Sequence, residues 1–543
     1  MPAFERVGVA DYKYSEKGCA ATCLRQGGDA EIQESIDCCR GQIAQYKVLR
    51  CVRFVPEFPM TVTGKMLKIP HSGADGGADR IRLRAGRVSP GRSSMALRKE
   101  VAILGAGPAA IATACALRRL GHDVLLIGVP RNSAVEGVSQ RTLRLLREHG
   151  LAAAADSVGD PGERVGSWAG IDVAGNGEYV VQRAEFDRAL LADAAAIGVR
   201  ICAERVVRYE RRGALWRVHT KRNYVDCQVA VDARGRRAQR SPRRGPALIA
   251  VCQRLCTPRT GRVLTRLEAI PQGWCWLAAD GRGMSWLQIT SGREPSLRLG
   301  LEEHMRRLVA MAPHVAADLS GAIATGAPIA RAATPSLCTQ PDQVGVIRAG
   351  DASIALDPLS GQGMYEALRS VVAVTGAVRG YLSGSWDPIA KFMAERATEL
   401  WQQSSLKAAH HYGQQAQQNP SSFWSEAAAR YCAIQPTPPI AGGVSIDWRP
   451  VLNGARIELR RVVVTPQSPR GVWQVDAIDL PELLDFLRAA RVTNVERAAR
   501  HFGCPPAATA RAMQWLSEHG LLEPAGAAGS TGPHGPPIGR FDY

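Results

Sequence analysis

The clearest pattern of apolar and polar positions in this chain begins at Val101. The stretch VAILGAGPAAIATACALRRLGHDVLLIG runs from a continuous apolar segment through two glycines into a helical pattern, and then into a second apolar segment. Short continuous apolar runs of this kind are typical of strands that are buried on both faces of a parallel sheet. The pattern therefore predicts a strand, a tight turn, a helix and a second strand between Val101 and Gly128, at the start of an α/β domain.

The turn in this unit has the chemistry of a dinucleotide-binding site. Gly105 is suited to the tight turn, Gly107 lets the backbone approach a pyrophosphate, and Ala110 replaces the third glycine where the helix packs on the strand. The helix is expected to start at Pro108, so that its N–H groups and positive dipole end point at the phosphates. A complete strand–turn–helix–strand unit makes this signal strong.

One expected part of the unit is missing. The acidic residue that usually follows the second strand and bonds a ribose hydroxyl is replaced by Gly128. The ribose therefore needs another partner, and Arg131 and Glu136 are the nearby candidates.

A second glycine-rich stretch, GDASIALDPLSGQGMYEAL, covers Gly350 to Leu368. It contains no obvious nucleophile, general base or pair of metal ligands, and a helix is expected from about Gly363. It resembles the second FAD-binding motif of the p-hydroxybenzoate-hydroxylase-like flavoproteins. The resemblance implies that Asp351 bonds a ribityl hydroxyl and that the helix directs its N-terminus at the flavin N1/C2 carbonyl, where reduced flavin is anionic. It also implies that a loop of small residues passes under the isoalloxazine ring: Pro358, Ser360, Gly361, Gln362 and Gly363.

Two further stretches fit the same family. Arg183 to Ile201 resembles its RxxFDxxL helix with the following strand, and Val231 to Ala238 resembles its DATGRxS turn, where the chain passes back under the flavin. The likeness covers about Val101 to Leu400. It implies an α/β fold in which a Rossmann-like FAD-binding domain is interleaved with a β-sheet substrate domain, and it implies FAD as the cofactor.

Shorter sequence features indicate which reaction the flavin is expected to carry out. No second GxGxxG is present, so we expect electrons from transiently bound NAD(P)H or from a separate flavin reductase. The strand WCWLAA, within Gly273 to Gln288, resembles the WxWxIP signature of flavin-dependent halogenases, although a pair of tryptophans is also an ordinary half-buried strand pattern. Halogenases need a lysine in this part of the fold, and none lies between Lys99 and Lys221.

The best resemblance is therefore to the halogenase-like monooxygenases that modify a tryptophan of a partner protein during maturation of quinone cofactors. That resemblance implies hydroxylation of an aromatic substrate, a small molecule or a partner protein, through a flavin hydroperoxide. A halogenase and a flavin-dependent reductase of prenyl chains share the glycine motif and stay open as alternatives. No catalytic residue is predicted, and His410 and His411 are expected on a helix surface.

The beginning of the chain resembles a different enzyme. Cys39 to Lys68, and more broadly residues 27–70, resemble the end of the C-terminal lid of acyl-CoA synthetases, with a CRGQIAxYKVPR helix and a PMTxTGK loop. In that family the lysine at the position of Lys65 swings onto the acyl-adenylate. The large domain that binds ATP is absent, and Leu49 replaces the usual proline. We therefore interpret the segment as a ligase remnant, in which Lys65 would be catalytic only if the segment kept ligase activity.

The end of the chain has a helical pattern. Leu480 to Glu523 predicts three short helices with an N-cap at Asn494 and a turn at Gly503, and it resembles a winged-helix module. We favour a protein-docking or lid role over DNA binding, because the third helix offers few groove-reading side chains; a flavin-sensing DNA-binding regulator and a decayed fusion without cofactor are the remaining alternatives.

Composition adds limits to this interpretation. The formal net charge is +18, with its densest run from Arg234 to Gly245, which we expect to be a solvated loop rather than a nucleic-acid site. Fourteen cysteines occur without a CxxC pair, which favours a reducing compartment and no metal site. The N-terminus has no signal pattern and no apolar run reaches the roughly 18 residues of a membrane span, so we expect a cytoplasmic protein without a membrane span. The predicted domains are a lid-like fragment (1–70), a linker (71–97), the FAD-binding and substrate domains (98–400), an extension (401–475), a winged-helix-like domain (476–525) and a disordered tail (526–543).

Overall fold

The computed structural model describes residues 4–11, 15–22, 51–54, 97–130, 134–238, 243–292, 295–339, 343–434, 443–490 and 494–522. The chain divides into two compact units, Met1–Arg92 and Ser93–Tyr543. In the first unit, β2 (Ser15–Thr22) pairs antiparallel with β1 (Phe4–Asp11) and parallel with β3 (Cys51–Phe54). Lys65 and the lid-like helix lie outside the described residues.

The second unit begins with the predicted α/β domain. Its central sheet has the order β10-β11-β12-β4-β5-β9 with β21 beside β12, seven strands among the described residues. The pairs of β4 with β5 and β12, of β5 with β9 and of β12 with β21 are parallel. The strands are β4 (Leu97–Leu104), β5 (Val124–Ile127), β9 (Arg200–Cys202), β10 (Val206–Arg212), β11 (Leu215–Thr220), β12 (Tyr224–Asp232) and β21 (Val346–Arg348). The predicted α/β class is confirmed.

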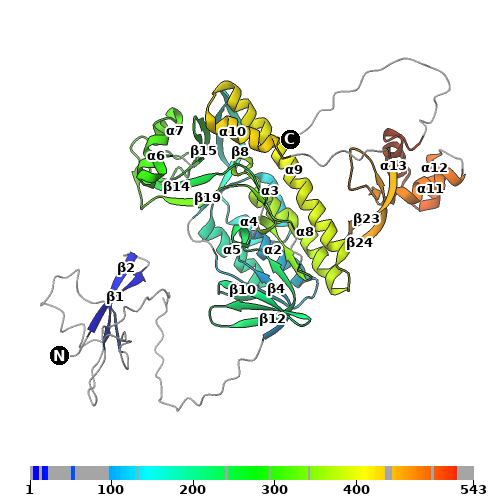
Figure 1. Ribbon diagram of the computed structural model, residues 1–543, viewed down its shortest axis with the longest axis horizontal. Coiled ribbons are helices and arrows are strands. Elements are labelled where there is room, and N and C mark those ends of the chain that lie inside the picture. The colour runs from blue at the N-terminus through cyan, green and yellow to red at the C-terminus, as the bar shows by residue number, and fades with distance from the viewer. Residues whose placement is uncertain are drawn as a thin grey trace, which may run out of the picture. The chain divides into compact units, whose positions relative to one another are not determined.

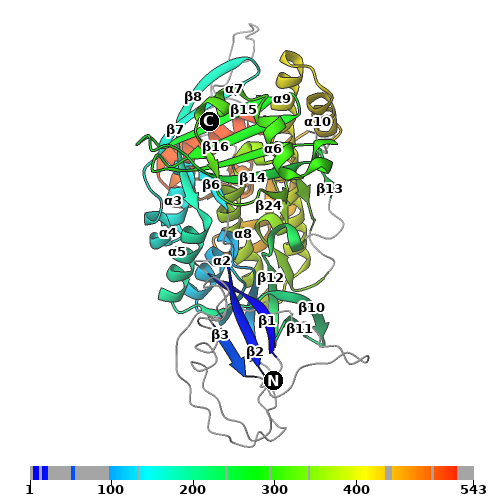
Figure 2. The ribbon, with the colours of Figure 1, turned by 90° about the vertical axis from the view of Figure 1, so that its left-hand side faces the viewer.

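Helices bury one face of this sheet (Figures 1 and 2). The core there is formed by alternate residues of the central strands, such as Val101 and Ile103, together with the apolar sides of the helices. The covering helices are α2 (Pro108–Arg119), α3 (Gln140–Glu148), α4 (Ala152–Asp156), α5 (Arg183–Ala196) and α8 (Gly363–Leu382). The predicted starts of α2 at Pro108 and of α8 at Gly363 are confirmed.

A larger mixed sheet forms the second layer, with the order β18-β14-β17-β16-β15-β7-β8-β6 and β19 beside β14, nine strands in the described part of the chain. These strands are β6 (Val135–Val138), β7 (Gly162–Trp168), β8 (Ile171–Gln182), β14 (Ile249–Cys256), β15 (Leu264–Ile270), β16 (Gly273–Ala279), β17 (Met284–Ser291), β18 (Ile323–Ala324) and β19 (Ile329–Ala332). Figure 2 shows this sheet at one end of the unit. The helices α6 (Leu301–Val309) and α7 (Pro313–Asp318) cover the face that carries Cys275 and Leu277.

The opposite face of the large sheet packs on a helical hairpin made of α9 (Asp387–Gln418) and α10 (Ser422–Cys432). α9 lies beside α8 (Figure 1). It is continuous across residue 400, so the predicted boundary between a core domain ending at 400 and an extension starting at 401 falls inside one helix. The helix continues there because buried positions recur through Trp401, Ala408 and Tyr412.

The C-terminal part joins the rest of its unit through a β-hairpin. β23 (Ser445–Asn453) and β24 (Arg456–Val464) pair antiparallel, and Ile457 enters the core of the FAD-binding layer. A glycine on α8 permits this approach, because a Cβ added at Gly376 would lie 2.7 Å from Leu452 Cδ1.

The three predicted tail helices are confirmed as α11 (Leu480–Ala490), α12 (Val495–Phe502) and α13 (Pro506–Glu518). The predicted N-cap is confirmed as well, since Asn494 Oδ1 accepts a 2.9 Å hydrogen bond from the backbone N–H of Arg497. A short hairpin of β25 (Gln474–Val475) and β26 (Ile478–Asp479) precedes the helices. Among the described residues no helix is both long and apolar enough to cross a membrane.

Candidate FAD-binding site

The first glycine turn leaves no room for a side chain. Gly105 follows β4 directly and has φ +124°, and a Cβ there would lie 2.4 Å from the carbonyl oxygen of Ala233. The turn is held on both sides, because Gly105 N donates to Ile127 O at 2.8 Å and Ala233 N donates to Leu104 O at 2.8 Å. A glycine is therefore required where the turn crosses the end of β12.

The next glycine is open instead of crowded. A Cβ added at Gly107 would meet no heavy atom within 4 Å. α2 starts at the following residue, Pro108, and no side chain caps its end, so its first-turn N–H groups have no partner within the helix. Ala110 is buried at 1% exposure, as expected for the position that packs the helix on the sheet. Free space beside an uncapped helix N-terminus suits a phosphate group.

The structure gives a reason for the missing acidic residue. A Cβ added at Gly128 would lie 2.4 Å from the carbonyl carbon of Gly105 and 2.6 Å from the nitrogen of Ala106. Here the glycine turn packs directly on the end of β5, and an aspartate or glutamate would displace it. Of the two predicted ribose partners, Arg131 lies outside the described residues, so that prediction stays a prediction.

The other candidate, Glu136, already serves an ion-pair network. Its Oε1 accepts a 2.7 Å hydrogen bond from Arg183, and Arg183 also pairs with Asp187. Arg183 and Asp187 are buried at 2% and 0% exposure. Burial lowers the pKa of Arg183, but the carboxylates of Glu136 and Asp187 outweigh this effect and raise the pKa overall. The network joins β6 to the start of α5, and its sequence signal was the i, i+4 pair inside RxxFD.

The second glycine motif lies against the first one. Gly350 begins the short 3-10 helix η4 (Gly350–Ala352), has φ +56°, and a Cβ there would lie 3.0 Å from Ala109 Cβ on α2. Asp351 Oδ2 lies 4.0 Å from Arg236 Nε, in the turn after β12. The structure thus brings together three predicted segments: the first glycine turn, the turn after β12 and the Gly-Asp pair.

The loop after η4 exposes its backbone. The 3-10 helix η5 (Pro358–Ser360) ends at Gly361 with φ +60°, and a Cβ at Gly361 or Gly363 would meet nothing within 4 Å. Ser360, Gly361 and Gly363 are exposed, and no side chain caps the start of α8 at Gln362. A planar ring could approach this loop closely, and the helix N-terminus would favour negative charge on it. The residues of both loops therefore fit FAD.

The turn after β12 corrects one prediction. Arg234, at the head of the basic run that we expected to be a solvated loop, donates to both carboxylate oxygens of Asp232, with Nε–Oδ1 at 2.9 Å and Nη2–Oδ2 at 2.7 Å. Asp232 is fully buried and would be an unpaired interior charge without this partner. The run then continues as the 3-10 helix η2 (Gly235–Ala238), and residues 239–242 lie outside the described ones.

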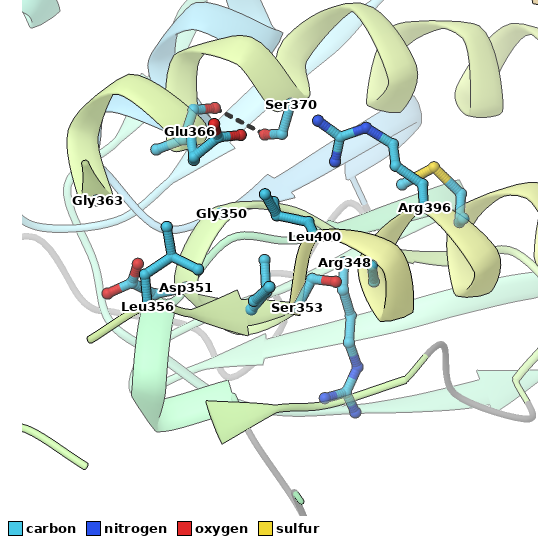
Figure 3. A pocket seen from close by; sticks show the side chains of 14 residues that line it. Arg348, Gly350, Asp351, Ser353, Leu356, Gly363, Glu366, Ser370, Arg396 and Leu400 are labelled. Carbon is cyan, nitrogen blue, oxygen red and sulfur yellow. Dashed lines mark hydrogen bonds between the residues drawn. The ribbon is translucent and has the colours of Figure 1, made fainter. Parts of the chain in front are cut away.

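A small cavity lies beside Asp351, between η4, α8 and α9 (Figure 3). In Figure 3 the guanidinium of Arg396 extends toward Ser370 and Glu366, whereas Arg348 points away from them. Glu366 is 7% exposed; its Oε1 accepts a hydrogen bond from Arg369 at 3.0 Å, and its Oε2 has no hydrogen-bond partner. The free space of about 20 Å³ suits a water molecule, so this cavity cannot itself hold a flavin.

The tryptophan strand has a structural role, and the histidine pair lies at the surface. Trp274 of β16 is 1% exposed and packs on the α9–α10 hairpin, and Trp276 Nε1 donates to Glu178 at 3.4 Å. His410 and His411 lie on α9 and are exposed, as predicted. Within the described ranges, no group of three or more histidine, cysteine or acidic side chains could hold a metal ion.

Comparison with known proteins bears directly on the first glycine loop. The family model described as "FAD binding domain" matches residues 98–241. The chain carries an FAD-binding domain. This match contains the first glycine turn and the turn after β12, and Asp351 and the second loop lie against them in the structure.

Two sequence relatives cover different parts of the chain. Digeranylgeranylglycerophospholipid reductase 1 of Methanopyrus kandleri is 29% identical over 304 residues, which is 50% of this chain and 77% of the reductase. A medium-chain acyl-CoA ligase of Danio rerio is 42% identical over 62 residues, which is 11% of this chain. The chain thus spans only 10% of the ligase's length.

Solved structures resemble most of the chain. One is titled a peptidyl tryptophan dihydroxylase, QhpG, essential for tryptophylquinone cofactor biogenesis; it is 29% identical, with a TM-score of 0.66 over 78% of this chain and 100% of that one. The flavin-dependent halogenase CmlS is 17% identical, with a TM-score of 0.60 over 78% of this chain and 95% of that one. The second likeness shows a shared fold alone. Together with the FAD-binding domain, the first likeness shows the fold of an FAD-dependent oxidoreductase.

Proposed function

We propose that this protein is an FAD-dependent monooxygenase that hydroxylates an aromatic ring, and that its substrate is a tryptophan side chain of a partner protein. One observation carries the proposal: the likeness to the peptidyl tryptophan dihydroxylase extends over that protein's full length at 29% identity. It covers 78% of this chain, far more than residues 98–241 of the FAD-binding domain alone.

The residues of the two loops have separate tasks in this proposal. Gly107 and the start of α2 would hold the pyrophosphate, Asp351 would bond the ribityl chain, and the backbone from Ser360 to Gly363 would lie against the ring. FAD, when bound and reduced, supplies the two-electron chemistry that activates dioxygen. The chain's own residues orient the substrate and exclude water, which is why the site needs no general base.

The overall reaction balances with a nicotinamide as reductant. One oxygen atom of dioxygen is inserted into an aromatic C–H bond to give a hydroxyl, and the other leaves as water. NAD(P)H supplies the two electrons, directly or through a separate flavin reductase, and one proton comes from solvent. No second dinucleotide-binding unit occurs in the sequence, which supports transient binding of the reductant or a partner reductase.

The proposal is tested with the FAD-loaded protein, a flavin reductase, NADPH and air. Free L-tryptophan and a pool of tryptophan-containing peptides serve as substrates, with the same peptides carrying phenylalanine in place of tryptophan as controls. We expect mass spectrometry to show a gain of one or two oxygen atoms on the tryptophan peptides only. Oxidation of neither tryptophan substrate, with NADPH consumed at the same rate in their presence and absence, would count against hydroxylation of tryptophan.

A second candidate function rests on the sequence relative from Methanopyrus kandleri, whose likeness covers 77% of a digeranylgeranylglycerophospholipid reductase. In that case the reduced flavin would add two hydrogen atoms to a carbon–carbon double bond of a prenyl chain, and oxygen would not be consumed. Anaerobic incubation with a geranylgeranyl phospholipid separates the two functions, because only the reductase oxidises its flavin there. Bromide added to the aerobic assay tests a halogenase, which the lack of a lysine between Lys99 and Lys221 disfavours.

The remaining assignments follow from the sequence. We place the enzyme in the cytoplasm, supported by cysteines that are all free among the described ones. We assign the ligase-like first 70 residues no part in the proposed oxygenation, since the likeness to the ligase extends over 62 residues only. The C-terminal helices serve as a docking surface for the partner protein in this account.

A further inference from the structure

One buried carboxylate stands directly before the loop proposed to face the flavin. Asp357 is 4% exposed and immediately precedes Pro358. Its Oδ1 accepts a 2.8 Å hydrogen bond from the backbone N–H of Leu359, which caps the 3-10 turn. Ser360 Oγ donates to the backbone oxygen of Asp357 at 2.7 Å. The aspartate therefore fixes the shape of the loop from inside the protein.

The other carboxylate oxygen of Asp357 contacts side chains that lie outside the FAD-binding layer. Oδ2 of Asp357 accepts a hydrogen bond from the Tyr412 hydroxyl at 3.0 Å and another from the Tyr431 hydroxyl. Tyr412 belongs to α9 and Tyr431 to α10, and both are buried, at 0% and 2% exposure. Two helices that follow the loop in sequence thus converge on a single oxygen atom.

The hydroxyl groups of Tyr412 and Tyr431 are not needed for the packing of the two rings. The rings of Tyr412 and Tyr431 pack edge to face with centroids 5.5 Å apart, among Trp274, Phe423 and Trp424. Phenylalanine would pack equally well in this cluster, but it would leave the buried carboxylate with one fewer donor. Burial raises the pKa of both tyrosines, so they stay protonated and act as donors.

The buried environment also shifts the pKa of Asp357. Burial raises the pKa of Asp357, while the hydrogen bonds from Tyr431, Leu359 and Tyr412 and the charge of Arg236 lower it in part. A buried carboxylate needs all of its donors, because each missing one leaves an unsatisfied interior charge.

We propose that Asp357, Tyr412 and Tyr431 are positioning residues through which the α9–α10 hairpin sets the conformation of the loop Pro358–Gly363, and with it the surroundings of the bound flavin ring. This inference rests on the proposed FAD site. It assigns the hairpin, which lies outside the residues matched by the FAD-binding family, a direct role in tuning the cofactor.

The test compares Tyr412→Phe, Tyr431→Phe and their combination with Tyr381→Phe as the control. Tyr381 lies near the opposite end of α8 from the loop and packs against Trp386 instead. For each full-length protein three quantities are measured: the dissociation constant for FAD, the visible spectrum at saturating FAD, and the urea midpoint without FAD.

We expect FAD to bind roughly twofold to tenfold more weakly for each hydroxyl removed at the loop. The spectrum of the bound flavin is expected to shift as well, because the ring meets a differently shaped loop. Tyr381→Phe should leave both readings as in the wild type.

Two results would overturn the inference. If Tyr412→Phe and Tyr431→Phe lower the urea midpoint but leave the FAD affinity and spectrum unchanged, the tyrosines are merely structural and the proposed function still stands. If the wild type binds no FAD, the cofactor assignment fails together with the inference.

Discussion

The two glycines of the first turn should respond differently to the same added methyl group. Gly107→Ala puts a Cβ where no heavy atom lies within 4 Å, so the protein without cofactor has room for it. The residue is the N-cap of α2, and alanine caps less well than glycine, which costs about 0.5–1 kcal/mol. That loss is small beside a total stability on the order of 5–15 kcal/mol.

The cofactor should be affected far more than the fold. In the proposed complex the methyl group stands where the pyrophosphate approaches the backbone, and overpacking of this kind costs about 1–3 kcal/mol. At about 1.4 kcal/mol for each tenfold change, FAD should bind roughly tenfold to a hundredfold more weakly. Titration with FAD, followed by quenching of flavin fluorescence, measures this change directly.

Gly105→Ala is the matched control, because we expect it to lower the stability of the protein without FAD. Its Cβ would meet backbone at 2.4 Å, and its φ of +124° is unfavourable for alanine. Strain of roughly 1–2 kcal/mol and overpacking of about 1–3 kcal/mol together predict a loss of about 2–5 kcal/mol in unfolding free energy. Urea unfolding without FAD tests it. A Gly107→Ala protein that binds FAD like the wild type, or a Gly105→Ala protein as stable as the wild type, would refute this reasoning.

Three further predictions concern stability. Arg183→Met should destabilise the protein by about 3–5 kcal/mol in urea unfolding, because it removes the guanidinium charge that faces the buried carboxylate of Asp187; a loss under about 1 kcal/mol would show that the pair is dispensable. Asn494→Ala should cost about 1 kcal/mol through the lost helix cap, read as a lower urea midpoint of the C-terminal helices. Burial lowers the pKa of His149, whose Nε2 lies 3.1 Å from Leu368 O. Its contribution to stability is therefore complete above its ordinary pKa of 6.5 and is lost as the pH falls toward the lower folded value. His149→Gln should accordingly lose less stability than the wild type between about pH 8 and about pH 5.

Local patterns predicted most of the cofactor domain. The starts of α2 and α8, the strand before the first glycine loop and the three tail helices were all readable, because each depends on turn residues, caps and periodicity within a few positions. The meeting of the Gly105 turn with Asp351 followed only from the family resemblance, since no local pattern fixes a contact between residues so far apart in the chain.

Other features could not be predicted in this way. The tie from Asp357 to Tyr412 and Tyr431 joins three elements, and nothing in the local sequence says which buried tyrosine meets which acid. The helix across residue 400 was not predicted, although Trp401, Ala408 and Tyr412, which the structure buries, are spaced at a helical period. The crowding at Gly128 likewise depends on how β5 meets the glycine turn, which is a property of packing.

The most direct test of the account is the visible absorption spectrum of the purified full-length protein, before and after FAD is added. The account predicts a yellow protein, or one that becomes yellow after FAD is added and excess FAD is removed, and release of FAD on denaturation. A colourless protein that retains no FAD even at high concentrations of added cofactor would contradict the assignment of the site at Gly107 and Asp351, and with it the proposed oxygenation chemistry.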